Sequence, residues 1–241
     1  MHWSDRALVL GCRALGESGV VLEAMTRGHG RHFGLVHGGR SRRLGPVLQP
    51  GNTLAVTWRA RLDEQLGTYV VEEEVSRAAR LIASAAALLG MATVASHLRL
   101  LAERDPHPVL FDAAEALLAH LDDPYLGPAL FALFELSLLA EFGFGLDLSA
   151  CAVTGAEEDL IYVSPRSGRA VGRLPGEPYR DRLLPLPSFL REGIGAMPGA
   201  AELGEAFRLT GFFLSEHLYG ARGQPLPDAR ARYVEMVTHM P

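Results

Sequence analysis

Residues 6–39 read RALVLGCRALGESGVVLEAMTRGHGRHFGLVHGG, and this stretch decides the fold of the first part of the chain. Its runs of strand-forming residues are separated by GESG and GHG, which are typical of turns. Together with the segments that follow, it brings the predicted strands to five: 6–15, 20–27, 31–39, 53–61 and 66–75. Five short strands, with a glycine-rich third one, predict a small closed barrel of the OB-fold type.

The composition changes at Ser76, where Ala and Leu become frequent and recur with helical spacing. Ser76 is a candidate N-cap, and Asp105-Pro106 ends this first helical pattern. Further helical patterns cover residues 109–123, 127–145, 186–193, 201–220 and 228–240. Two strand-like runs interrupt them, DLIYVS and RAVGR. The predicted fold class is therefore multi-domain α+β, with a five-stranded OB-fold barrel followed by a mostly α-helical domain. The barrel covers residues 1–75, the helical domain covers 76–241, and the small β-ribbon insert lies near 150–175.

The net charge of −5 conceals opposite charges on the two parts of the chain. Residues 1–61 hold nine arginines and three acidic residues, a formal charge of +6, whereas residues 62–241 carry −11. Lysine is absent from the sequence, so every one of the cations counted here is an arginine. Such an asymmetry predicts a surface on the first domain that binds a polyanion.

Seven arginines of the barrel region are candidates for binding nucleic-acid phosphates: Arg27, Arg31, Arg40, Arg42, Arg43, Arg59 and Arg61. Gly38 and Gly39 precede three of them and would let the backbone approach a phosphate closely. The alternative for the run HGGRSRR (37–43) is a solvent-exposed loop. Phe33, Trp58 and Tyr69 are candidates for stacking on bases, and the alternative for each is packing inside the barrel.

Several other classes of protein are disfavoured by the motifs. The pattern GxxxxGK[ST] of nucleotide-binding loops is missing, as are GxSxG and HExxH, so we expect no enzyme. The two cysteines, Cys12 and Cys151, have no CxxC spacing, and a structural zinc site is not expected. The N-terminal stretch lacks the features of a signal peptide, and no clean apolar run of about 18 residues is found. We therefore expect a cytoplasmic location and no membrane partner.

The order and spacing of several segments resemble the bacterial recombination mediator family RecO. The resemblance is carried by residues 7–43, by LQPGNTLAVTWRAR (48–61), by FELSLLAEFGFGLDLSACAVTG (134–155) and by the ribbon DLIYVSPRSGRAV (159–171). It implies an N-terminal OB-fold, a C-terminal helical domain and a non-catalytic, nucleoid-associated protein. The implied role is to bind single- and double-stranded DNA, to anneal complementary strands and to help load RecA on DNA coated by single-stranded DNA-binding protein. The implied partners are RecR, the C-terminal tail of single-stranded DNA-binding protein and, in many bacteria, RecF.

The sequence departs from this family at the ribbon. Many relatives carry a four-cysteine zinc site there, and Cys151 matches its first ligand. Thr154 stands at the CxxC partner position, and the returning strand SGRAVGR has no cysteine. Because one thiolate cannot hold a structural zinc, we predict that the family zinc site is lost and that the protein has no cofactor. Packing of Leu160, Ile161, Tyr162 and Val171 would then hold the ribbon.

Two other functions stay open from the residues alone. One is an RNA-binding OB-fold adaptor, and the other is an adaptor whose basic barrel binds an acidic peptide. Competition between DNA and RNA strands of equal length separates the first of these from a DNA-binding protein.

Overall fold

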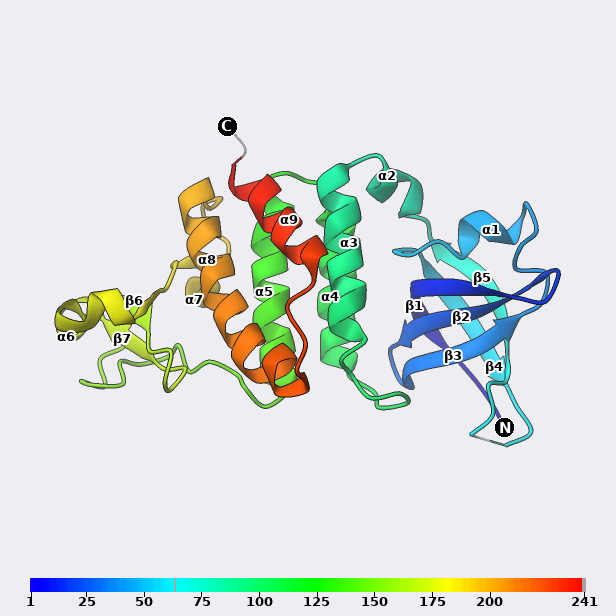
Figure 1. Ribbon diagram of the computed structural model, residues 1–241, viewed down its shortest axis with the longest axis horizontal. Coiled ribbons are helices and arrows are strands. Elements are labelled where there is room, and N and C mark those ends of the chain that lie inside the picture. The colour runs from blue at the N-terminus through cyan, green and yellow to red at the C-terminus, as the bar shows by residue number, and fades with distance from the viewer. Residues whose placement is uncertain (63, 240–241) are drawn as a thin grey trace. The chain divides into compact units, whose positions relative to one another are not determined.

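In a computed structural model, which describes residues 1–62 and 64–239, the first five strands close into a barrel (Figure 1). The strand order is β1-β2-β3-β5-β4, and β1 pairs with both β2 and β4. The strands are β1 (His2–Leu15), β2 (Gly19–Thr26), β3 (Gly30–Val36), β4 (Thr53–Arg59) and β5 (Thr68–Val75). The predicted fold class is confirmed: an OB-fold-like module precedes a helical region with a small sheet.

The barrel forms because the apolar side chains of its strands alternate. On β2, Val20, Leu22 and Ala24 point into the core, as do Val56 and Trp58 on β4. Glycine is required at position 34 of the third strand for a steric reason. A Cβ atom on residue 34 would lie 2.4 Å from the ring of Tyr69. A side chain at Gly34 would therefore displace an aromatic ring that fills the barrel.

The chain divides into two compact units, residues 1–122 and 123–241. The first unit adds four helices to the barrel: α1 (Leu44–Val47), α2 (Ala78–Ile82), α3 (Ala85–Leu98) and α4 (Pro108–His120). The single helix predicted to start at Ser76 is wrong, because Ser84 has an extended backbone that separates α2 from α3. Ser84 caps α3 by accepting a hydrogen bond from the Ala87 N–H. The segment 41–52 between β3 and β4 contains α1.

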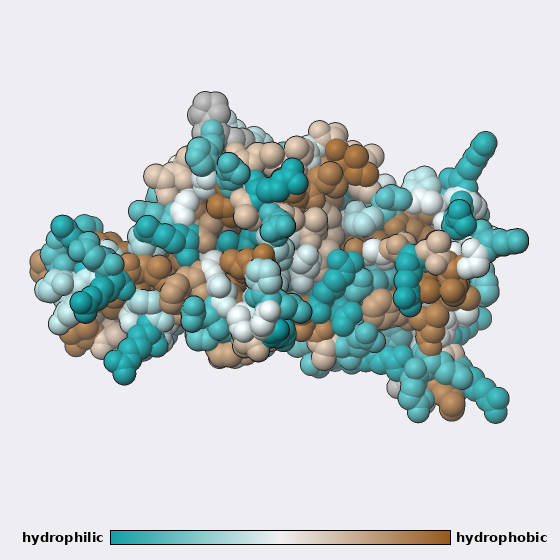
Figure 2. Space-filling view, viewed as in Figure 1, coloured by the Kyte–Doolittle hydropathy of each residue, from teal (hydrophilic) through white to brown (hydrophobic). Residues whose placement is uncertain are grey.

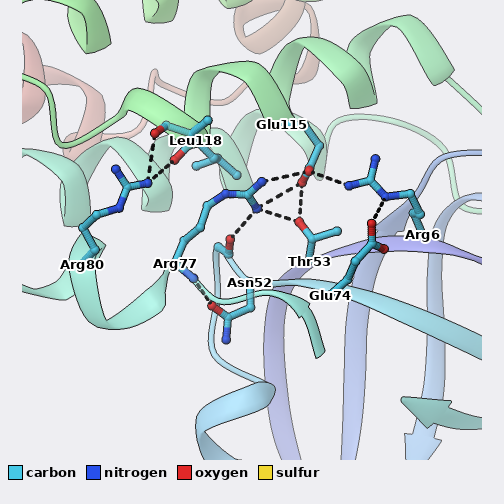
Figure 3. Close-up of polar contacts among 10 residues, drawn as sticks. Arg6, Asn52, Thr53, Glu74, Arg77, Arg80, Glu115 and Leu118 are labelled. Atoms are coloured by element: carbon cyan, nitrogen blue, oxygen red, sulfur yellow. Dashed lines mark hydrogen bonds and ion pairs between the residues drawn. The ribbon is translucent and has the colours of Figure 1, made fainter. Parts of the chain in front are cut away.

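A buried polar network joins the barrel to α2 and α4 (Figure 3). The Arg77 guanidinium donates to Thr53 at 2.7 Å and to the Glu115 carboxylate at 3.0 Å. The Asn52 side chain accepts from the N–H groups of Arg77 and Ala78, both at 2.8 Å. The side chain of Arg77 is 8 % exposed, so the guanidinium is shielded from solvent and needs these acceptors.

The second unit consists of helices with a small sheet at one side (Figure 1). Its main helices are α5 (Leu126–Glu141), α8 (Ala200–Phe213) and α9 (Asp228–Thr238). Its shorter elements are β6 (Leu160–Val163), β7 (Ala170–Gly172), α6 (Arg173–Gly176), η1 (Glu177–Arg182), β8 (Leu184–Pro185), α7 (Phe189–Glu192), η2 (Leu214–Tyr219) and η3 (Gly220–Arg222). The predicted ribbon is present as β6 and β7, and β8 adds a third strand. Residue 240, the last of the helix predicted at 228–240, lies outside the described residues.

A buried ion pair ties the three main helices of the second unit together. Glu135 of α5 is fully buried, and its carboxylate accepts from Arg230 of α9 at 2.7 and 2.8 Å. Thr210 of α8 donates to the same carboxylate, and the Arg230 guanidinium also lies over the ring of Phe207. Burial alone would lower the pKa of Arg230, but the attraction of Glu135 outweighs it and raises that pKa. None of the described helices is long and apolar enough to cross a membrane.

Candidate nucleic-acid interface

Two loops of the barrel carry candidate arginines. Residues 37–43 follow the last residue of β3, whereas residues 60–62 follow β4 and residues 64–67 precede the first residue of β5. Leu35 of β3 pairs with Thr68 of β5, and the Leu35 N–H donates to the Gly67 carbonyl at 3.0 Å. The β1–β2 turn contacts the first of these loops, because the Arg40 N–H donates to the Ser18 carbonyl at 3.2 Å. Hydrophilic side chains project from the barrel at several places (Figure 2).

Five candidate arginines are exposed on or beside these two loops: Arg40, Arg42, Arg43, Arg59 and Arg61. Within residues 1–62 and 64–239, none of the five forms an ion pair with a carboxylate. Arg40 donates one hydrogen bond to the backbone carbonyl of Glu17 at 3.1 Å, which orders its side chain without neutralising its charge. These five cations are therefore available to a polyanion, and we name them the rim arginines.

The two candidate glycines have different places in the loop. Gly38 has a φ of +65° and open space around a Cβ position, so it allows the turn after β3. Gly39 is buried, and a Cβ atom there would lie 2.3 Å from the Val20 side chain. Gly39 thus lets the loop pack on the barrel, whereas Gly38 leaves its backbone accessible.

The structure places Arg27 and Arg31 apart from the rim arginines, each in an ion pair. Arg27 donates two hydrogen bonds to Asp112 of α4, at 2.9 and 2.8 Å, and these bonds lower the pKa of Asp112. Arg31 is 14 % exposed and lies 3.1 Å from the Glu23 carboxylate and 3.7 Å from that of Glu103. The two arginines therefore stabilise contacts of the first unit, and a phosphate would have to compete with carboxylates for them.

Two of the three aromatic candidates cannot stack on a base, because they are buried in the barrel. Trp58 is fully buried and Tyr69 is 3 % exposed. The Trp58 ring lies 5.6 Å from the ring of Trp3 and donates its N–H to the Leu66 carbonyl at 3.0 Å. The structure therefore shows the alternative for Trp58 and Tyr69, which is packing inside the barrel. Phe33, by contrast, lies at an outward position of β3 and is half-buried.

Arg13 was missed by the sequence reasoning. It lies near the end of β1, its side chain is exposed, and it lines two cavities that Phe33 also lines. Alternation along β1 could not have found it, because Ala7 and Val9 face the core and only the bulge between Val9 and Gly11 brings Arg13 opposite Val21 on the outer face. Arg13 adds a cation on the outer face of the barrel.

The ribbon does not offer the ligands of a zinc site. No group of three His, Cys, Asp or Glu residues suited to a metal occurs in the described part of the chain. The Cys151 sulfur is buried and accepts a hydrogen bond from the Gly172 N–H at 3.3 Å. Burial would raise the pKa of Cys151, but hydrogen bonds from Thr154, Gly172 and Val153 lower it to about 7. Protein N–H and O–H groups thus surround the sulfur, and the residues present do not fit a four-ligand metal.

Comparisons with known proteins agree with this architecture. Residues 1–76 match the family model described as Recombination protein O N terminal, and residues 79–224 match Recombination protein O C terminal. The chain belongs to the recombination protein O family. Proteins of that family named DNA repair protein RecO are similar over nearly their whole length. A relative from Methylorubrum extorquens is 58 % identical over 99 % of both chains.

Two further recombination protein O relatives show the same extent of similarity. A relative from a Chelativorans species is 56 % identical over 98 % of this chain and 96 % of its own. A relative from Beijerinckia indica is 54 % identical over 97 % of this chain and 94 % of its own. The two family models meet between residues 76 and 79, whereas the compact units divide at residue 122. A domain boundary after residue 75 stays a prediction.

Proposed function

We propose that this recombination protein O family member is a non-catalytic DNA repair protein whose barrel binds DNA phosphates. One observation carries the proposal: the rim arginines are exposed on or beside two loops of the barrel and have no carboxylate partner within residues 1–62 and 64–239. Clustered cations on loops neutralise phosphates without reading bases, so the binding is largely independent of sequence. The relatives' printed name, DNA repair protein RecO, supports a role in repair.

The mechanism follows from charge neutralisation. Two complementary strands repel each other through their phosphates, and cations of the barrel loops that hold both strands reduce that repulsion. Annealing of complementary strands would follow, with no covalent step. The protein would help to load RecA on DNA coated by single-stranded DNA-binding protein, with RecR, the tail of that protein and, where present, RecF as partners.

We expect replacement of Arg40, Arg42 and Arg43 together with alanine to weaken binding of single- and double-stranded DNA. The slope of log K against log salt should fall by about 2 for a single strand, because each neutralised phosphate contributes about 0.7. Fluorescence anisotropy of labelled DNA over a series of salt concentrations measures this slope. A slope equal to that of the wild type would show that the loop 37–43 does not bind DNA.

The matched control removes the same charge elsewhere. Arg169, Arg173 and Arg180 of the second unit are exposed and ion-paired with Asp147, Asp159 and Glu177, respectively. Their joint replacement with alanine should leave the salt slope unchanged. In the same assay, preferential binding of RNA over DNA of equal length would favour an RNA-binding adaptor. Binding of an acidic peptide with no affinity for nucleic acid would favour a protein adaptor.

We expect the purified protein to contain zinc far below one equivalent. Thr154 stands at the position where the family pattern would need a second thiolate. Backbone N–H groups donate hydrogen bonds to the sulfur of Cys151. Elemental analysis of protein purified without chelator, before and after added zinc and gel filtration, measures the content. A stoichiometric, chelator-sensitive zinc would contradict loss of the metal.

A further inference from the structure

Phe33 is the aromatic side chain that β3 presents on the outside of the barrel. Residues of β3 alternate between buried and half-buried positions, and Phe33 belongs to the half-buried set. It lines a cavity of about 250 Å³ beside Gly11 and Arg99, and a second of about 410 Å³ beside Leu66 and Arg104. Phe33 and Arg13 line both cavities. The two cavities are therefore continuous and form one groove across the outer face of the barrel.

Gly11 makes room for the Arg99 side chain at the floor of this groove. Gly11 lies at a β-bulge of β1, and a Cβ atom there would lie 3.0 Å from the Arg99 guanidinium. Arg31 covers part of Phe33, with its guanidinium carbon 5.5 Å from the ring centroid. Arg31 is itself held by Glu23 and Glu103, so the ring is supported by an ordered cation.

We propose that bases of a single DNA strand enter this groove and stack on Phe33, while the rim arginines hold the phosphates. The inference rests on the proposed function and deepens it, because it assigns single-strand recognition to one side chain. An aromatic ring beside a basic surface is the usual arrangement by which proteins bind single strands. Leu66, which is 38 % exposed, adds an apolar contact next to Phe33.

The charges of the groove favour a base over a phosphate. Its arginines, Arg13, Arg99 and Arg104, lie among the carboxylates of Glu23, Glu64 and Glu103. Glu23 accepts from both Arg31 and Arg99, which neutralises much of the local positive charge. A nearly neutral groove with a half-buried aromatic ring suits an uncharged base, whereas the phosphates remain at the positively charged rim.

The test compares single strands with duplexes. Phe33→Leu keeps an apolar side chain on β3 but removes the aromatic face, and Phe33→Tyr retains that face. We expect Phe33→Leu to weaken binding of an oligothymidine by about 5- to 100-fold, as one lost stacking contact predicts, and to leave duplex affinity unchanged. Bases of a duplex are stacked inside the helix and do not reach the groove. Phe33→Tyr should bind the oligothymidine like the wild type.

A strand of abasic residues provides a second measurement that needs no variant. The wild type should bind it more weakly than oligothymidine by a similar factor, and Phe33→Leu should show a much smaller difference. The matched aromatic control is Phe144→Ala in the second unit, where the ring is 41 % exposed and stacks on His217 at 4.6 Å. This variant should leave both affinities unchanged.

The outcomes separate this inference from the proposed function. If the wild type binds both forms of DNA and Phe33→Leu binds oligothymidine normally, stacking on Phe33 is overturned and phosphate binding stands. If Phe33→Leu weakens single-strand and duplex binding equally, a selective role in base stacking is also overturned. If the wild type binds neither form of DNA, the proposed function fails and this inference fails with it.

Discussion

Replacing Arg230 with alanine is expected to lower the free energy of unfolding by about 3–5 kcal/mol. The reason is that the fully buried carboxylate of Glu135 would lose the two hydrogen bonds, at 2.7 and 2.8 Å, that the guanidinium donates. Thr210 would still donate to Glu135, but one hydroxyl does not balance a buried negative charge. Urea denaturation followed by circular dichroism of the helices measures the loss.

The control for this prediction is an exposed ion pair of the same unit. Arg173 lies 3.1 Å from the Asp159 carboxylate, and both side chains are more than half exposed. Arg173→Ala should therefore change the stability by less than about 1 kcal/mol. A double replacement, Glu135→Leu with Arg230→Met, should recover much of the loss, because it removes both buried charges. A loss below about 1 kcal/mol for Arg230→Ala would show that the pair does not stabilise the fold.

Replacing Arg77 with alanine is expected to lower the stability of the first unit by about 3 kcal/mol. The change removes the donors to Thr53 and to the Glu115 carboxylate, whose side chain is only 12 % exposed. The two tryptophans of the sequence, Trp3 and Trp58, both lie in the barrel strands. Tryptophan fluorescence during urea denaturation therefore follows the barrel directly.

The neighbouring Arg80 supplies the control for Arg77. Arg80 forms an ion pair with Asp122 and donates to the carbonyl of Leu118, but its side chain is 45 % exposed (Figure 3). Arg80→Ala should shift the fluorescence midpoint much less than Arg77→Ala, because water solvates the groups left behind. Equal shifts for the two variants would contradict a special role for the buried network.

Local patterns were enough to predict the strands and most of the helices. The alternation of apolar residues on β4 and the turn residues that precede it act between near neighbours in the sequence. The same reasoning failed at Ser76, because the N-cap signal of a serine depends on the backbone that follows it. Ser84 has the extended conformation and the hydrogen bond to Ala87 that a cap requires.

The candidate site was predicted only in part for a related reason. The pattern of arginines located the basic barrel, and five of these arginines are exposed on or beside two of its loops. It did not separate these from Arg27 and Arg31, whose charges are compensated by acidic side chains. The strand pattern also did not decide which rings face inward, and Trp58 and Tyr69 proved to be core residues while Phe33 faces outward.

The sequence by itself determined the class of fold, the place of the barrel and the opposite charges of the two parts of the chain. These follow from composition and from periods of two or 3.6 residues, which neighbouring residues express locally. Only the tertiary structure decided which charges are exposed and which are buried. Arg27 meets Asp112 across 85 positions, and Arg230 meets Glu135 across 95, so these pairs form only when the chain has folded. Glu135, which in the sequence interrupts an apolar run, is thereby held at the centre of the second unit.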